Sequence, residues 1–184
     1  MKITINPKQL TPDDTWQSFR KVRAIVENEE GYIALSIEGG KCIFPGGKCN
    51  PEEPEDIAIK RELTEESGID FTDATFHKLF ELETLYDDFY DYRSDSLKPR
   101  YTMTTYYYVK TSQKIDESKM QLTEGELKEN FKIRFVDRET LEQMLLEDHS
   151  EMVNGKFFDE ENKIVFDKVL KSRWFLIYFF NIML

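Results

Sequence analysis

Hydrophobic residues gather in short β-rich runs at four places along the chain. The first two runs are residues 20–26 and 32–37, and a turn at residues 29–31 separates them. Two short runs joined by a glycine-containing turn are typical of a β-hairpin. Two longer stretches follow at residues 75–83 and 101–109, and the alternation of apolar and polar positions is strongest in the first of them. The pattern therefore predicts strands on both sides of a central segment.

A helix is predicted in that central segment, from about Pro54 to Ser67. Proline suits the first turn of a helix because its missing N–H has no intrahelical acceptor there, and Gly68 is the natural residue just past the last turn. Two further helices are predicted towards the C-terminus. The first covers residues 136–147, with apolar side chains at helical spacing, and the second begins at Glu161.

The central helix carries three glutamates that lie close together. At about 100° per residue, Glu65 lies about 60° to one side of Glu62, and Glu66 lies about 40° to the other. Ile59 and Leu63 form an apolar stripe beside them that can face a core. Like charges at this spacing repel each other, so a cation is expected to offset the repulsion. Hard divalent ions such as Mg²⁺ or Mn²⁺ prefer oxygen ligands of this kind.

The loop before the helix changes the interpretation of these glutamates. A glutamate-rich helix face is most often only solvated surface. Here the apolar run of residues 41–44 turns sharply at Pro45-Gly46-Gly47, and two glycines allow the backbone to approach a ligand closely. The loop, the glutamate spacing and the helix together favour a cation site over a solvated surface.

Residues 47–69 fit the pattern G-x5-E-x7-R-E-U-x-E-E-x-G-U, in which U is a bulky aliphatic residue. This pattern is the Nudix box, and the segment resembles the Nudix hydrolases. The resemblance is specific over these residues and extends more loosely to about residue 150. It implies an α/β fold, in which an α/β/α sandwich surrounds a mixed sheet. The loop–helix–loop of the box lies on one face, and an extra C-terminal helix is expected.

The resemblance also implies how the box binds metal. Glu62, Glu65 and Glu66 would be the metal ligands, and the backbone carbonyl of Gly46 would be a further ligand. Mg²⁺ or Mn²⁺ held in this way neutralises a diphosphate and activates water. The three glutamates would therefore be catalytic.

Other residues of the box would support these ligands. Arg61 would belong to the catalytic set by orienting a carboxylate, with Glu53 as the candidate partner. Gly47, Glu53 and Gly68 would be structural parts of the box. In this family the general base is either a box glutamate or a carboxylate from a later loop. Glu129 is the candidate from a later loop, six residues before an aromatic that resembles the start of a late family strand.

The catalytic interpretation of Glu129 stands beside two alternatives. Glu124 and Glu126 are rivals for the role of general base. Glu129 could equally be an ordinary solvated loop charge. The choice between these residues is open at this point.

The segment from residue 86 to residue 100 is polar and aromatic, and its length suits a functional loop or an extended hairpin tip. Tyr86 is a candidate for stacking on a substrate base, or for covering the edge of the core. Diadenosine-polyphosphate hydrolases tend to have tyrosine at the corresponding distance past the box. Arg93 and Arg100 are candidates for substrate binding, together with Lys48 and Lys98. All of these cations could instead be ordinary surface residues.

Composition sets the remaining limits. A length of 184 residues suits a single domain over residues 1–184, with a core at about 18–150 and a C-terminal helical segment at about 160–184. A net charge of −11 argues against an extended nucleic-acid surface. The start has no sustained apolar run, and two cysteines make no disulfide framework, so a cytoplasmic location is expected.

These observations favour a metal-dependent hydrolase that cleaves a pyrophosphate bond in a nucleotide or another nucleoside diphosphate derivative. One alternative is a catalytically silent Nudix module that senses a ligand. A second is a diphosphate isomerase, which uses a cysteine and an altered box. The apolar tail at residues 174–184 is too short to span a bilayer and suits burial in the core, a subunit interface or peripheral membrane contact. A homodimer is compatible with the resemblance.

Overall fold

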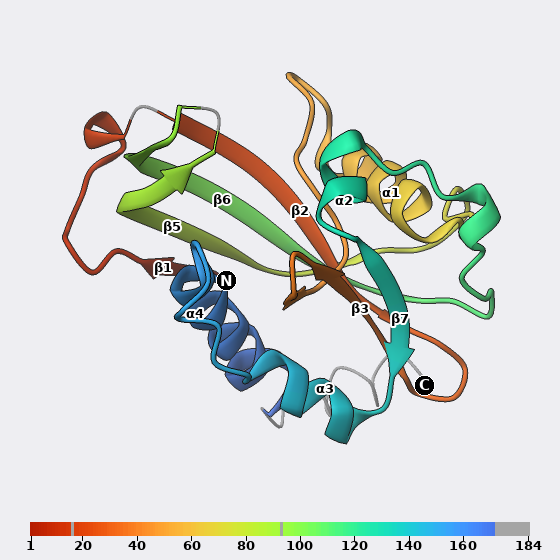
Figure 1. Ribbon diagram of the computed structural model, residues 1–184. Coiled ribbons are helices and arrows are strands. Elements are labelled where there is room, and N and C mark those ends of the chain that lie inside the picture. The colour runs from red at the N-terminus through yellow and green to blue at the C-terminus, as the bar shows by residue number, and fades with distance from the viewer. Residues whose placement is uncertain (16, 93, 172–184) are drawn as a thin grey trace.

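The computed structural model describes residues 1–15, 17–92 and 94–171, and a mixed seven-stranded sheet lies at its centre (Figure 1). The strands are β1 (Lys2–Ile5), β2 (Gln17–Glu27), β3 (Ile33–Glu38), β4 (Lys41–Ile43), β5 (His77–Asp91), β6 (Ser96–Lys110) and β7 (Lys132–Val136). The α-helices are α1 (Glu55–Ser67), α2 (Glu124–Lys128), α3 (Arg138–Leu145) and α4 (Gly155–Val165). Two short 3₁₀ helices, η1 (Pro12–Asp14) and η2 (Glu117–Lys119), and a π-helix, η3 (Phe166–Leu170), complete the elements.

The sheet combines parallel and antiparallel pairs. Its order is β1-β5-β6-β2-β3-β4, and β7 pairs with β3 outside this path. β2 runs parallel to β6 along its whole length, and β5 and β6 form a long antiparallel hairpin. β3 pairs antiparallel with β2, β4 and β7. The box loop after β4 returns to β2, where Ala24 N and Val22 N donate to the carbonyls of Pro45 and Gly47 at 2.9 Å.

Helices cover both faces of the sheet, because β2 alternates its side chains between two cores. Val22, Ala24 and Val26 pack with Ile59 and Leu63 of α1. A second cluster on the opposite face joins the side chains of α3 and α4 to those of β2, β3, β5 and β6. It includes Ile25, Leu35, Phe80, Tyr106, Leu141, Phe157 and Val165. Figure 1 shows α1 and α4 on opposite sides of β2. The predicted α/β/α sandwich around a mixed sheet is confirmed.

The box helix begins and ends where its sequence predicts. Pro54 is the N-cap residue rather than the first helical residue, and its carbonyl accepts the first hydrogen bond, from Ala58 at 2.9 Å. Gly68 ends the helix with φ 67°, and its N–H donates to the carbonyl of Thr64 at 2.9 Å. A Cβ at Gly68 would lie 2.1 Å from the carbonyl oxygen of Asp116, so glycine is required there for space as well as for conformation.

The segment at residues 86–100 is an extended hairpin, which is one of its two predicted forms. β5 continues to Asp91 and β6 starts at Ser96, so both strands are much longer than the predicted stretches. The register shifts between Tyr86 and Phe89, which places a β-bulge near the middle of this hairpin.

Several predicted boundaries towards the C-terminus were wrong. Val136 ends β7 instead of starting a helix, because the side chain of Asp137 accepts a hydrogen bond from Thr140 N at 2.9 Å and caps α3. The last helix starts at Gly155 rather than Glu161, because Asn154 takes a left-handed conformation, φ 61°, that starts a new helix. β7 also begins at Lys132, before Phe135, the aromatic residue that was expected to open it.

Three short elements were not predicted. α2 is a five-residue helix with a capping box, and β1 and β4 contain four and three residues. Patterns this short carry little periodicity. Among the described residues, no helix combines the length and apolar character that crossing a membrane requires. The predicted apolar tail at residues 174–184 lies outside the described residues.

Candidate active site

Arg61 of α1 lies at the centre of a carboxylate network. Its Nε and Nη2 donate to the two carboxylate oxygens of Glu53 at 2.8 and 2.9 Å, which makes a bidentate pair. Its Nη1 lies 2.8 Å from Oε1 of Glu62 and 3.0 Å from Oε2 of Glu65. Its Nη2 also donates to the carbonyl of Lys48 at 3.2 Å. These contacts pair Arg61 with Glu53, and they tie the box loop to the helix.

The network affects its carboxylates differently. Hydrogen bonds from Arg61 lower the pKa of Glu53 to about 2, so Glu53 is ionised at neutral pH. The pKa of Glu62 is raised, mainly by burial and further by the charges of Glu65 and Glu126, although Arg61 acts in the opposite direction. The surroundings of Glu62 therefore only partly compensate its ionised form.

Glu66 faces the box loop from the buried side of α1. It is 5% exposed, and its Oε2 accepts a hydrogen bond from the backbone N–H of Gly46 at 2.9 Å. Burial raises the pKa of Glu66 well above its usual range, while Gly46 and the charge of Arg23 act to lower it. A nearby cation favours the ionised form of such a carboxylate.

The two glycines of the loop let the backbone pass between β2 and α1. A Cβ on Gly46 would lie 2.3 Å from the carbonyl oxygen of Val22, and one on Gly47 would lie 2.2 Å from Oε2 of Glu62. The carbonyl of Gly47 also accepts a hydrogen bond from Val22 N at 2.9 Å. The loop therefore touches the sheet on one side and the α1 carboxylates on the other. A Cβ at Gly46 would meet backbone, whereas one at Gly47 would displace the side chain of Glu62.

The carboxylates fit a divalent cation by their chemistry. The described part of the chain contains no ready-made cluster of three His, Cys, Asp or Glu side chains around a common point. Glu62 and Glu65 contact Arg61, while Glu66 faces Gly46. All three are nevertheless oxygen donors on one helix face, and two of them have a raised pKa, which suits Mg²⁺ or Mn²⁺. Binding would require Glu62 and Glu65 to share their charge between Arg61 and the ion.

Arg23 of β2 is a residue of this site that the sequence analysis missed. It is 5% exposed, and its Nη1 donates to the carbonyl oxygen of Phe44 and lies 3.5 Å from that of Gly46. The signal was an arginine within a strand of buried apolar residues, since a buried guanidinium requires partners. Arg23 thus holds the start of the box loop. The role of the Gly46 carbonyl as a metal ligand stays a prediction.

Glu129 and its rivals lie on or beside α2. The side chain of Glu129 lies against Gly39 in the β3–β4 turn, and its backbone carbonyl accepts a hydrogen bond from Gly39 N at 2.9 Å. Glu126 is the α2 residue whose charge raises the pKa of both Glu62 and Glu66. Its carboxylate also accepts hydrogen bonds from Thr123 and caps the helix. The structure thus places Glu126 in electrostatic contact with the box carboxylates.

The predicted substrate-binding residues have different positions. Tyr86 is 4% exposed, and its ring packs against Phe157 of α4 with the centroids 4.1 Å apart, so it covers the core as in the second of its two interpretations. Burial and nearby glutamates raise its pKa. Arg93 lies outside the described residues. Arg100 of β6 lies between the rings of Phe19 and Phe89 and lines a surface pocket.

We expect the Arg61→Lys variant to lose about 10- to 100-fold in apparent affinity for Mg²⁺ or Mn²⁺, the range found when a partner of a metal ligand is removed. Lysine keeps the charge but cannot hold Glu53 by a bidentate contact and reach Glu62 and Glu65 together. The measurement is the metal concentration that gives half-maximal turnover. Arg20→Lys, which changes a more exposed arginine on β2, is the matched control. Equal metal dependence in both variants would contradict the assigned role.

Comparisons with known proteins identify a matching family model and similar solved structures. The family model described as NUDIX domain matches residues 18–160. The NUDIX domain of Shewanella oneidensis NrtR, complexed with ADP ribose, has a TM-score of 0.51 and 14% identity, and the match covers 84% of this chain and 92% of that chain. A MutT protein from Methanosarcina mazei Go1 has a TM-score of 0.48 and 20% identity, over 80% of this chain and 96% of that chain.

None of the curated proteins matches the chain. The similarity to the Shewanella domain concerns the fold alone, because the identity is low. The family model covers most of the chain and includes the whole box. The chain belongs to the NUDIX family.

Proposed function

We propose that this protein is a divalent-metal-dependent hydrolase, which cleaves the pyrophosphate bond of a nucleotide or of another nucleoside diphosphate derivative. One observation carries the proposal. Glu62, Glu65 and Glu66 share one face of α1 and are held against a glycine loop by Arg61 and by the N–H of Gly46. An arrangement of carboxylates beside an open backbone turn suits a metal–diphosphate complex.

The three glutamates would hold Mg²⁺ or Mn²⁺, with the Gly46 carbonyl as a further ligand. When bound, such an ion neutralises phosphate charge and lowers the pKa of water. The protein's own contribution is to keep the ligands in place. Arg61 holds Glu62 and Glu65 on one side of the site, while burial and the Gly46 N–H fix Glu66 on the other.

The attacking water must lose a proton. We assign Glu129 as the general base that accepts this proton. If Glu129 is the general base, Glu129→Gln lowers kcat by about 100-fold, because glutamine cannot accept a proton. Glu126→Gln, on α2 three residues before Glu129, is the matched comparison. Its glutamine can still accept the hydrogen bonds from Thr123, so the cap survives. A larger loss in Glu126→Gln than in Glu129→Gln would transfer the role to Glu126.

The proposed reaction is tested with a panel of nucleoside triphosphates, dinucleoside polyphosphates, ADP-ribose and nucleotide sugars. ADP-ribose belongs in the panel because the Shewanella NUDIX domain is complexed with it. Released phosphate and nucleotide are measured with Mg²⁺, with Mn²⁺ and with EDTA. We expect turnover of at least one class with either metal and none with EDTA. Failure of every compound with both metals would contradict the proposal.

A further inference from the structure

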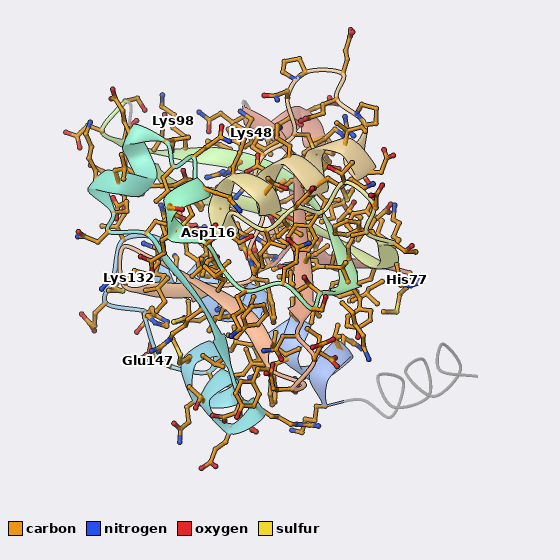
Figure 2. The ribbon with its side chains drawn as sticks, turned by 90° about the vertical axis from the view of Figure 1, so that its right-hand side faces the viewer. Lys48, His77, Lys98, Asp116, Lys132 and Glu147 are labelled. Atoms are coloured by element: carbon orange, nitrogen blue, oxygen red, sulfur yellow. The ribbon has the colours of Figure 1, made fainter. Side chains whose placement is uncertain are left out.

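A surface pocket lies directly beside the box loop. It has a volume of about 280 Å³, and we name it the distal pocket. Its lining includes Phe19 of β2, Lys48 of the box loop, and Phe89 and Arg100 of the β5–β6 hairpin. Lys48 follows Gly47 in the box loop. The carbonyl of Lys48 accepts a hydrogen bond from Arg61, so the pocket begins where the carboxylate network ends. Figure 2 shows Lys48 next to α1.

The guanidinium of Arg100 is fixed in the wall of this pocket. Its central carbon lies 4.5 Å from the ring centroid of Phe19 and 4.0 Å from that of Phe89, so aromatic rings hold it in place. The β-bulge between Tyr86 and Phe89 lies opposite Arg100 in the register of the hairpin and accompanies the contact between Phe89 and the guanidinium. The arginine is thus positioned by packing.

The hydrogen-bonding capacity of this arginine is incompletely used. Nε of Arg100 is buried and has no hydrogen-bond partner among the described residues. A buried donor without an acceptor is costly, so this guanidinium keeps unused hydrogen-bonding capacity. Because aromatic rings lie against the guanidinium, a ligand would bind in the plane of the guanidinium. Its N–H groups there match the paired oxygens of a phosphate or a carboxylate.

Positive charge is also in excess around Arg100. Lys48 contributes a second cation, with its Nζ 4.0 Å from the ring centroid of Phe19. Lys21 lies on the inner side of β2, where burial and then the charges of Arg100 and Arg23 lower its pKa to about 7, so it is only partly charged at neutral pH. Two carboxylates oppose them. Asp91 lines the pocket and pairs with Lys98 at 3.7 Å, and Glu161 of α4 faces the cations from the inner side.

We propose that the distal pocket binds a second oxyanion of the substrate, a phosphate or a carboxylate, at the end away from the diphosphate that is cleaved. This inference rests on the proposed function, and it adds a substrate class to it. Preferred substrates carry a negative charge beyond the scissile diphosphate. Arg100 supplies the planar donors, and Lys48 adds charge from the side of the box loop.

The test is calorimetric binding in EDTA, where metal-dependent turnover is absent. Two ligand pairs separate the sources of the oxyanion: UDP-glucuronate with UDP-glucose for a carboxylate, and adenosine 5′-tetraphosphate with ADP for a phosphate. We expect the wild-type protein to bind the more anionic member of at least one pair about tenfold more tightly, the value of one charge-assisted contact. The pair that shows the preference identifies the oxyanion.

Three variants make the assignment specific. Arg100→Gln should lose the preference, and Arg100→Lys should keep only part of it because it retains the charge without the planar donors. Lys110→Gln removes a cation from the other end of β6 and should keep the preference in full. Equal binding of both members by the wild type, no binding of either, or an unchanged preference in Arg100→Gln would overturn the proposal. The result is independent of whether the panel compounds are hydrolysed.

Discussion

We expect Glu66→Gln to lower kcat/KM for any substrate of this protein by about 1,000-fold, because it removes the charge of a proposed metal ligand, and such a charge contributes several kcal/mol. The substitution preserves the shape of the side chain. The amide oxygen of glutamine can still accept the hydrogen bond that Gly46 N donates at 2.9 Å. The loss therefore reports the negative charge at this position rather than the packing around it.

A control on the same helix isolates this effect. Asp56→Asn removes a negative charge from an exposed position of α1, away from the arc of the three glutamates. It should leave kcat/KM within about twofold, since exposed charges are largely screened. Thermal melting of both variants checks that they are folded. Turnover by Glu66→Gln within tenfold of the wild type would remove this carboxylate from the metal site.

Gly46→Ala destabilises the protein by about 3–4 kcal/mol. Two causes add: Gly46 has φ 126°, which side-chain-bearing residues rarely adopt, and its new Cβ would lie 2.3 Å from the carbonyl oxygen of Val22. The neighbour is backbone in the middle of β2, so it cannot move aside without breaking the strand. The measurement is the free energy of unfolding from a denaturant titration.

Gly31→Ala separates the two causes. Gly31 also has a positive φ, 79°, but no atom lies within 4 Å of a Cβ built there. It should therefore cost only about 1 kcal/mol, the conformational part alone. Equal losses in the two variants would show that the close contact between the box loop and β2 contributes nothing to stability.

The sequence predicts the box helix and the central strands well because their signals are local. Pro54 and Gly68 mark the ends of α1, and the β-rich run at residues 20–26 lies within β2. The region after residue 120 was less predictable. A side-chain cap at Asp137 and a left-handed Asn154 decide where α3 and α4 begin, and both competed with an apolar pattern that fitted longer or shifted helices.

The same division applies to the candidate site. The pairing of Arg61 with Glu53 was an expectation from the resemblance to the Nudix box, and the structure places the two side chains in contact. The sequence pattern could not show that Arg61 also contacts Glu62 and Glu65, because these contacts depend on side-chain conformations. Phe19 was missed as well, since only the parallel pairing of β2 with β6 brings it beside Arg100.

The central claim is that the α1 carboxylates hold a divalent ion. Its most direct test is a titration with Mn²⁺, followed by electron paramagnetic resonance, which reports the unbound ion. We expect the wild-type protein and Asp56→Asn to bind Mn²⁺ with the same affinity, and the double variant Glu65→Gln/Glu66→Gln to bind it at least tenfold more weakly. Equal binding by the double variant and the wild type would contradict the claim, because the ion would then be held elsewhere in the chain.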